Sequence, residues 1–480
     1  MKNNHLQRRL IASIALALCT TAIQAAENLP SSRDALFGDD EAPKQAAPAK
    51  QEAAPKPGDS KEALFGDDLG LPKKTPAASS WRGYIQEELA HTTASPARWS
   101  KILTRAEIEN QGRLNDKVKY KLSARLDYDA VYDLYKNHYP TDVRNNQKLN
   151  FNLRENYLDV DAGDWDFRLG RQQVVWGEVV GLFFADVVSA KDDREFILPD
   201  FDVLRIPQWA VRAEYFKNDF HAELLWIPVP TYDEIGKPGA NFFPGLPAVP
   251  GFATQYQNEL RPERTLGNTN YGLRLSTLNN GWDVSGFYYH SLDAAPTFYR
   301  NIALAPQPTL SYQARHDRIQ QIGGTVAKDL GSFVLKGEAV YTHGRQFNVT
   351  NLTDSDGVVP QNTLDWVASL DFDLPAETRL NLQLFQRVFF NHNPDIISDK
   401  HENGFSVLLN GKLTHRVEAQ ALWIASLNRS DWLLRPSVTW TMERNLRLRF
   451  GADIFQGPPL GLFGRFDNQD RVYTELRYSY

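Results

Sequence analysis

The stretch from Arg471 to Tyr480, RVYTELRYSY, has a side-chain pattern with a period of two. Every second residue is apolar or aromatic, apart from one threonine: Val472, Thr474, Leu476, Tyr478 and Tyr480. The residues between them are mostly polar or charged: Tyr473, Glu475, Arg477 and Ser479. Successive side chains of a β-strand point to opposite faces, so this pattern predicts an amphipathic strand.

Two interpretations of this strand are open. It resembles the closing strand of a bacterial outer-membrane barrel, in which Leu476, Tyr478 and Tyr480 form the C-terminal signal read by the barrel-assembly machinery. It also fits an ordinary amphipathic strand of a soluble β-domain. The rest of the chain decides between the two.

The first residues are typical of a secretory signal peptide. A basic start is followed by a short apolar run from Leu10 to Ala22, and a small residue, Ala25, stands at the expected cleavage point. The run is shorter than the roughly 20 apolar residues that a spanning helix needs. The only cysteine, Cys19, lies within residues 1–25, so we expect no disulfide and no thiol chemistry in the mature chain.

The composition excludes two classes of protein. Removal of residues 1–25 takes away three positive charges and moves the net charge from −6 to −9, which argues against nucleic-acid binding. No later stretch has the roughly 18 uncharged apolar residues of a membrane-spanning helix. The chain nevertheless has 11 Trp, 19 Tyr and 26 Phe, which suits a membrane barrel with a polar lumen and an apolar outer face.

Residues 26–78 are rich in Ala, Pro, Lys, Glu and Asp, and we expect them to form a disordered periplasmic tail. Two near-identical octets occur in it, RDALFGDD at 33–40 and KEALFGDD at 61–68. One interpretation is a docking motif for a periplasmic partner, in which two copies raise avidity. Its apolar anchors and acidic pairs are Leu36, Phe37, Asp39, Asp40, Leu64, Phe65, Asp67 and Asp68. The alternatives are a local duplication without function and an acidic cluster that attracts calcium weakly.

Residues 79–480 repeat the period of two many times. From Val118 to Ala130, apolar residues alternate with charged or polar ones over 13 residues, whereas strands of soluble proteins usually have about 5 to 6. A tilted strand crosses a bilayer with about 9 to 11 residues. We therefore expect a charged face on the lumen, where arginines and acids pair with one another, and an apolar face on lipid.

This pattern predicts an all-β fold, a transmembrane antiparallel β-barrel of about 18 strands, with 16 to 18 as the range. The expected strands lie near 81–91, 100–111, 117–131, 148–160, 164–175, 207–216, 219–228, 268–278, 281–292, 318–329, 332–344, 362–373, 378–391, 402–413, 416–427, 430–442, 445–456 and 470–480.

The connections between these strands alternate in length. Short turns on one side and long loops on the other are typical of outer-membrane barrels, in which the short turns are periplasmic. An even strand number then places both termini in the periplasm. One junction, Asn428-Arg429, is short where a long loop is due. The loop from Pro228 to Pro262, with Phe242 and Phe243, is either an apolar extracellular cap or a rigid surface loop.

Four stretches carry a resemblance to a known family: LGRQQVVWGE (169–178), LFFADVVSAKD (182–192), FILPDFDVLRIPQWAVRAEYF (196–216) and WIPVPTYDEIGKPGANFFP (226–244). They resemble the proteobacterial outer-membrane family catalogued as domain of unknown function number 1302. The resemblance covers most of residues 80–480 and implies an outer-membrane barrel. Members are often encoded beside pumps resembling exporters of hydrophobic molecules and beside periplasmic proteins resembling lipid carriers. This context implies a role in moving hydrophobic compounds.

The densest group of candidate site residues follows the fifth expected strand: Arg168, Arg171, Trp176, Glu178 and Asp186. They surround the apolar segment Val179–Val188, which we expect to fold into the lumen as a short helix and to constrict the pore. Arg171 and Glu178 would hold it by charge-assisted hydrogen bonds. The alternative is that the segment packs on a neighbouring loop outside the pore.

The sequence has no enzyme signature and no histidine spacing typical of a metal site, so we expect no catalytic residue, no metal and no cofactor. The leading hypothesis is a barrel in the outer membrane of a Gram-negative bacterium, in contact with lipid, that takes part in transport of hydrophobic or amphipathic compounds. Its tail would dock a periplasmic carrier or pump component. A second hypothesis is a plugged barrel that anchors a periplasmic assembly, and a less favoured one is an outer-membrane hydrolase.

Overall fold

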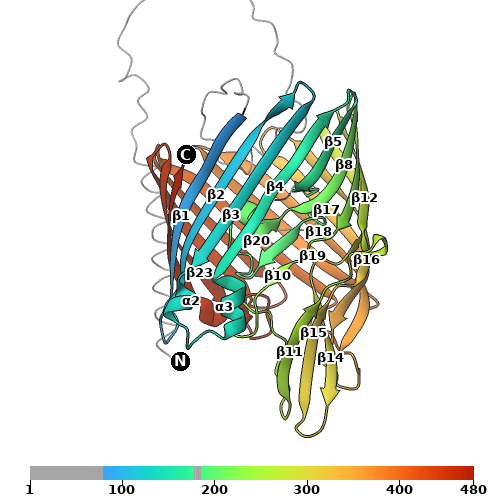
Figure 1. Cartoon of the computed structure of the whole chain (residues 1–480), viewed down its shortest axis with the longest axis vertical. Helices are drawn as coiled ribbons and strands as arrows, with labels where there is room; N and C mark the ends of the chain where they lie inside the picture. Colours follow the sequence, from blue (N-terminus) through green and yellow to red (C-terminus); the bar gives the residue numbers. More distant parts are fainter. Residues whose placement is uncertain (1–78, 178, 180–184) are drawn as a thin grey trace, which may run out of the picture. The chain divides into compact units, whose positions relative to one another are not determined.

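The computed structural model describes residues 79–177, 179 and 185–480, and these residues form a closed β-barrel (Figure 1). Eighteen strands lie in one sheet. The first strand, β1, pairs with β2 on one side and with the last strand, β24, on the other, so the sheet has no free edge. The predicted fold class is confirmed. Among the described residues, no helix is long and apolar enough to cross a membrane.

The barrel strands are β1 (Ser79–Thr92), β2 (Trp99–Asn115), β3 (Val118–Asp129), β4 (Leu149–Asp161), β5 (Trp165–Gln172), β8 (Gln208–Lys217), β9 (Phe220–Val229), β12 (Asn270–Asn279), β13 (Trp282–Leu292), β16 (Arg318–Asp329), β17 (Val334–Asn348), β18 (Val358–Leu374), β19 (Thr378–Phe390), β20 (His401–Thr414), β21 (Val417–Ser426), β22 (Trp432–Glu443), β23 (Leu446–Gln456) and β24 (Arg471–Ser479). The connections hold α2 (Val131–Leu134), α3 (Thr141–Gln147), β6 (Ala190–Asp193), α4 (Phe201–Leu204), β7 (Arg205–Ile206), β10 (Glu234–Ile235), β11 (Ala253–Leu260), η1 (Leu266–Asn268), β14 (Thr297–Ala303), β15 (Thr309–Arg315) and η2 (Gly464–Gln469).

Each of the 18 predicted strand ranges corresponds to one barrel strand. On the short-turn side, β2 continues to Asn115 rather than ending near residue 111, and the other large differences are at the long-connection end of the barrel. There β5 ends at Gln172 rather than near residue 175, whereas β17 and β18 extend further than predicted. Asn428 and Arg429 lie in a five-residue connection, 427–431, on the side of the long loops. The alternation of short and long connections therefore holds, with this connection as a short member of the long set.

The two faces of the strands differ as the period of two predicts. In β3, Arg125 and Asp127 are buried on the lumen side, whereas Leu122 and Leu126 are 52% and 45% exposed on the outer side. Lumen charges pair between neighbouring strands, as in the ion pair of 2.8 Å between Arg105 Nε and Asp127 Oδ1. This cross-strand ion pair is an example of the predicted arrangement.

The seam between β1 and β24 continues to the last residue. The amide of Tyr480 donates to the Gly83 carbonyl at 2.9 Å, and the Gly83 amide donates to the Tyr480 carbonyl at 3.0 Å. Gly83 also lies close to β2 on its other side. A Cβ atom at Gly83 would be only 2.3 Å from the Glu107 carbonyl oxygen, so the approach of these two strands requires glycine. Leu476, Tyr478 and Tyr480 are 40%, 45% and 55% exposed on the outer side. Their role as an assembly signal stays a prediction.

A small second sheet projects beyond the long-connection end of the barrel (Figure 1). It consists of β11, β15 and β14, and β11 pairs with β15 in parallel. Phe243 packs into the hydrophobic core of this sheet, whereas its neighbour Phe242 packs in a different cluster with Leu198 and Phe455. The loop from Pro228 to Pro262 therefore places one of these two phenylalanines in the projecting sheet and the other at the end of the barrel.

Substitution of Leu122 by arginine tests whether the outer face contacts lipid. An arginine on the lipid face costs about 2–4 kcal/mol at the bilayer midplane and about 0–1 kcal/mol near the interfaces. We expect Leu122→Arg, in the middle of β3, to lower the free energy of unfolding by about 2–4 kcal/mol. Leu114→Arg, at the turn end of β2, is the matched control. Urea unfolding of the barrel in lipid vesicles measures both, and two equally small effects would contradict a membrane-facing surface.

Candidate functional site

We call the connection between β5 and β8, residues 173–207, the inward segment, because its described residues, 173–177, 179 and 185–207, lie inside the barrel. Four of its buried residues form one cluster with side chains of the barrel wall. The members from the segment are Val174, Trp176, Ala185 and Val188, and those from the wall are Ala210, Leu225, Ile227, Phe287, Tyr289 and Val340. On β9, Leu225 and Ile227 alternate with the exposed Leu224 and Trp226. The cluster is therefore on the lumen side.

Two of the predicted site residues meet the wall or the segment itself from within the lumen. Trp176 is fully buried, and its Nε1 donates to Glu223 Oε1 on β9 at 2.9 Å. Asp186 is 3% exposed, and its Oδ2 accepts a hydrogen bond of 2.8 Å from Arg205 Nε. This second pair links two parts of the inward segment that are 19 residues apart.

The predicted arginines lie in the wall. Arg168 donates to Asp159 on the neighbouring strand at 2.6 Å and lies over the ring of Tyr157, so it does not hold the inward segment. Arg171 Nε has no hydrogen-bond partner among the described residues. Glu178 lies outside them, and so does the predicted bond between Arg171 and Glu178.

The inward segment is mostly irregular where the structure describes it. Val179 and residues 185–188 are not helical, whereas residues 180–184 lie outside the described part. The described helix of the segment, α4, is at Phe201–Leu204, and the helix predicted within Val179–Val188 stays a prediction. A small sheet also forms here, in which β6 pairs with β7 and with β10.

Glu338 of β17 holds both ends of the apolar stretch, and the sequence did not single it out. Its Oε1 accepts a hydrogen bond of 2.7 Å from the Val179 amide, and its Oε2 accepts one of 3.0 Å from the Ala185 amide. The side chain is 4% exposed. A carboxylate that accepts from main-chain amides leaves no signal in the sequence, because any residue supplies the donor.

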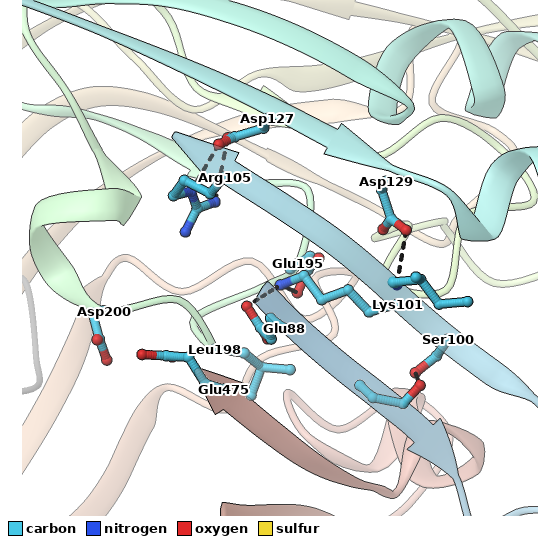
Figure 2. Close-up of polar contacts among 12 residues, drawn as sticks. Glu88, Ser100, Lys101, Arg105, Asp127, Asp129, Glu195, Leu198, Asp200 and Glu475 are labelled. Carbon is cyan, nitrogen blue, oxygen red and sulfur yellow. Dashed lines mark hydrogen bonds and ion pairs between the residues drawn. The ribbon is translucent and has the colours of Figure 1, made fainter. Parts of the chain in front are cut away.

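A chain of ion pairs, which we call the seam network, joins the inward segment to both sides of the closing seam. Figure 2 shows its part at Glu195, Lys101 and Glu88. Glu195 pairs with Lys101 Nζ of β2 at 2.8 Å and with Arg471 Nη1 of β24 at 3.4 Å. Lys101 also pairs with Glu88 of β1 at 3.0 Å.

The seam network continues through Asp453 of β23, which is fully buried. Its two oxygens accept from Arg471 Nε at 2.7 Å and from Arg435 Nε at 2.8 Å. Arg435 in turn donates from Nη2 to the Leu198 carbonyl at 2.7 Å. One carboxylate therefore fixes two arginines that both reach the inward segment.

Further wall arginines contact the inward segment. The contacts run from Arg125 of β3 to the Val203 carbonyl at 3.4 Å, from Arg154 of β4 to the Arg205 carbonyl at 2.9 Å, and from Arg449 of β23 to Asp200 at 3.2 Å. The segment is thus bonded to strands on many sides of the ring. Three of these wall arginines donate to main-chain carbonyls, namely Arg125, Arg154 and Arg435, and sequence reasoning cannot predict such bonds.

Two carboxyl groups near the small sheet of β6, β7 and β10 have raised pKa values: Asp193 of β6 and Asp233, which precedes β10. Burial raises the pKa of Asp193 to about 8, and the nearby Asp233 adds to the rise. Burial also raises the pKa of Asp233. Asp192, next in sequence, is paired with Arg194 at 2.6 Å, which together with hydrogen bonding lowers its pKa despite burial. The carboxyl group of Asp193 is therefore protonated near neutral pH.

Substitution of Asp193 by asparagine tests whether the pKa of Asp193 is raised in the folded protein. Because the pKa of Asp193 is higher in the folded chain than the usual value near 3.9, the native protein loses stability as pH rises from about 4 towards 8. Asparagine does not titrate. We expect the melting temperature of Asp193→Asn, relative to the native protein, to increase between pH 5 and 8 and to level off above that. Asp373→Asn, at a side chain 91% exposed, is the control. A difference independent of pH would contradict the prediction.

Glu214, His221 and Glu223 are the candidate metal ligands within the described residues, because their ligand atoms lie within 4.8 Å of one another. Each already has a protein partner. Glu214 pairs with Arg212 at 2.6 Å and with His221 at 3.1 Å. His221 Nδ1 lies 3.2 Å from Ser276 Oγ, and Glu223 accepts from Trp176. These bonds account for the cluster without an ion.

Comparison with solved structures gives outer-membrane proteins. OmpTdeltaL8, a loop L8 deletion mutant of OmpT from Vibrio cholerae, is 10% identical, and the alignment covers 84% of this chain and 100% of that chain with a TM-score of 0.39. Salmonella typhi OmpF, in a complex with daunomycin, is 9% identical, with 84% and 97% covered and a TM-score of 0.42. Similarities of this size do not indicate a shared function.

No curated protein matches the sequence. A family model does match, and it confirms the resemblance seen in the four stretches between 169 and 244. The match runs over residues 97–442, from β2 to β22, and includes the whole inward segment. The chain therefore belongs to the family described as protein of unknown function DUF1302.

Proposed function

We propose that this barrel takes part in the transport of hydrophobic or amphipathic compounds across the outer membrane of a Gram-negative bacterium, and that the inward segment controls passage. The observation that carries the proposal is the position of the described residues of the inward segment within the lumen, bonded to the wall through Glu338 and the seam network. A segment held there by polar bonds narrows the lumen and can be released by breaking them. The family resemblance supplies the hydrophobic character of the cargo.

The charges of the lumen favour an amphipathic compound over a purely hydrophobic one. Buried ion pairs such as Arg105–Asp127 and Arg471–Asp453 line the interior. A polar head group can form hydrogen bonds with charged side chains of the lumen, whereas a purely apolar solute cannot. We therefore favour cargo that carries both an apolar part and a polar part.

The tail is proposed to dock a periplasmic carrier or pump component. Its motif residues lie outside the described residues. In the barrel, Ser79 pairs with Gly112 near the short turn after β2, and Tyr480 pairs with Gly83, so both ends of the described chain are on the short-turn side. Short turns are periplasmic in such barrels. Deletion of residues 27–72 is expected to abolish co-purification of the partner, and an unchanged set of partners would contradict docking.

Single-channel conductance in a planar bilayer tests the transport proposal. The intact barrel is compared with a variant in which Val179–Val188 is replaced by a short Gly-Ser linker. We expect low conductance in the intact protein and steady conductance in the variant, because the linker removes the stretch that Glu338 holds in the lumen. Silence in both proteins would contradict the proposal.

No conductance in either the intact barrel or the linker variant would favour the second function, a plugged barrel that anchors a periplasmic assembly. The observation in favour of an anchor is the number of directions from which the wall holds the inward segment, from β2 and β3 to β17 and β24. A hydrolase would require turnover of lipid or peptide by the purified barrel, and the absence of enzyme activity remains a prediction.

A further inference from the structure

A cavity of about 520 Å³ lies between the inward segment and the wall formed by β13 and β16 to β19. It is near the long-connection end of the barrel, where these strands begin or end. The inward segment contributes Asp186 and Lys191, and the wall contributes Asp293, Arg345 and Arg387. The volume is within the range of about 300–1,000 Å³ that is usual for sites of small organic molecules.

Arg387 offers an unoccupied edge of its guanidinium group to this cavity. Its Nε donates to Asp365 Oδ1 at 2.5 Å, and no bond from its Nη atoms is present among the described residues. The side chain is 37% exposed. By contrast, Arg345 donates from both Nε and Nη2 to Asp293, at 2.6 and 3.3 Å, and is fully engaged by that carboxylate. Free Nη donors suit a carboxylate or phosphate, which guanidinium binds through two parallel hydrogen bonds.

Asp186, which lines the cavity from the inward segment, has an unused acceptor. Its Oδ2 is bonded to Arg205, but its Oδ1 is buried and has no hydrogen-bond partner among the described residues. The residue is only 3% exposed. An unsatisfied buried acceptor costs about 1–3 kcal/mol, so a ligand that donates a hydrogen bond here recovers that cost.

Apolar side chains complete the cavity. They come from both the inward segment and the wall: Val187, Ile319, Val340 and Phe347. The cavity thus combines a free cationic edge, a free anionic acceptor and apolar surface within one volume. These three features are complementary to a molecule that has an anionic group, a hydrogen-bond donor and a short apolar chain.

We infer that this cavity binds a small amphipathic anion that carries a hydroxyl group, with the anionic group on Arg387 and the hydroxyl on Asp186. The inference rests on the proposed transport function, for which it names the class of compound. It assigns the recognition of the head group to the wall and the inward segment together. Movement of the segment then takes away half of the site and releases the compound.

Calorimetric titration of the full-length barrel in detergent tests the inference with three probes: 3-hydroxyoctanoate, octanoate and 1,3-octanediol. Octanoate lacks the hydroxyl group and the diol lacks the anionic group. We expect 3-hydroxyoctanoate to bind at least about tenfold more tightly than either, because each lost charge-assisted bond costs about 1.5–3 kcal/mol. Equal affinity for all three probes would overturn the inference.

Two variants test which residue binds the anionic group of the probe and which binds its hydroxyl group. Arg387→Gln is expected to weaken the binding of 3-hydroxyoctanoate about tenfold and to leave the diol unaffected. Asp186→Asn is expected to remove the advantage of 3-hydroxyoctanoate over octanoate. Arg379→Gln, at an arginine whose side chain is 71% exposed outside the cavity, is the matched control. Unchanged binding in Arg387→Gln would overturn the inference even if Asp186→Asn fails to fold.

The result separates this inference from the transport proposal. A barrel that binds 3-hydroxyoctanoate with this selectivity but stays silent when the Val179–Val188 stretch is removed would contradict transport and support the site. A barrel that conducts but binds none of the probes selectively would overturn the site alone.

Discussion

Replacement of Glu338 by alanine is expected to raise the single-channel conductance of the barrel severalfold and to make it fluctuate. The Glu338 carboxylate accepts hydrogen bonds from the amides of Val179 and Ala185, both inside the barrel. Alanine leaves both amides without an acceptor, at a cost of about 1–3 kcal/mol each. The inward segment is the part of the chain that can relieve this cost by moving into water, so its released state becomes populated.

Two further variants make the test specific. Glu338→Gln keeps one carbonyl oxygen as an acceptor, and we expect an intermediate conductance. Glu377→Ala removes an exposed acid that pairs with Lys412 in a turn, and we expect no change. Recordings in a planar bilayer at one salt concentration compare the four proteins. Identical conductance for native protein and Glu338→Ala would show that Glu338 does not hold the segment closed.

Replacement of Asp453 by alanine is expected to cost about 3–5 kcal/mol of barrel stability, because it leaves two buried arginines unpaired. Asp453 is fully buried and bonds Arg435 and Arg471 at 2.8 and 2.7 Å. Neither arginine can lose its charge by deprotonation at ordinary pH. The loss therefore appears in full as a lower free energy of unfolding.

The measurement is urea unfolding of the barrel in lipid vesicles, followed by the mobility shift between folded and unfolded forms on a gel. Asp373→Ala is the matched control, since its partner Arg379 is 71% exposed and an exposed ion pair contributes about 0–1 kcal/mol. A loss of less than about 1 kcal/mol in Asp453→Ala would mean that water reaches the two arginines in the native barrel.

The barrel itself was predictable because its signal is local. Alternation of apolar and polar residues needs only a strand and two environments, and turns such as Ala162-Gly163 mark where each strand ends. The register follows from the turns. Asp159 and Arg168 lie on either side of that turn and are cross-strand partners, so their ion pair could also have been inferred from sequence. Counting outward from the turn would have assigned Arg168 to the wall.

The end of β5 was not predictable in the same way. Val174 and Trp176 are apolar, but they have the opposite phase to the outer-face residues Trp165 and Leu169, and the sheet ends at Gln172. Val174 and Trp176 are buried by Phe287, Tyr289 and other wall side chains inside the lumen. This change of phase is present in the sequence, but apolar residues alone do not show whether they face lipid on a strand or pack inside the lumen.

The contacts of the inward segment were the least predictable part of the candidate site. Trp176 and Asp186 were identified from the sequence, but Glu338, Glu195 and Arg435 were not. Glu338 is 159 residues from Val179, and Arg435 is 237 residues from Leu198. Since both bond main-chain atoms, no pairing of residue types along the sequence points to them.

The seam network also bears on how the barrel can go wrong during assembly. Glu195 lies between Lys101 near the first strand and Arg471 in the last, which are brought together only when β1 meets β24. In an open sheet with its ends apart, Glu195 can pair with only one of them, and the other loses one of its two carboxylate partners. The charge of Glu195 is thus fully paired only in the closed barrel. This pairing favours a completed ring over curled but unclosed forms, before any cargo is present.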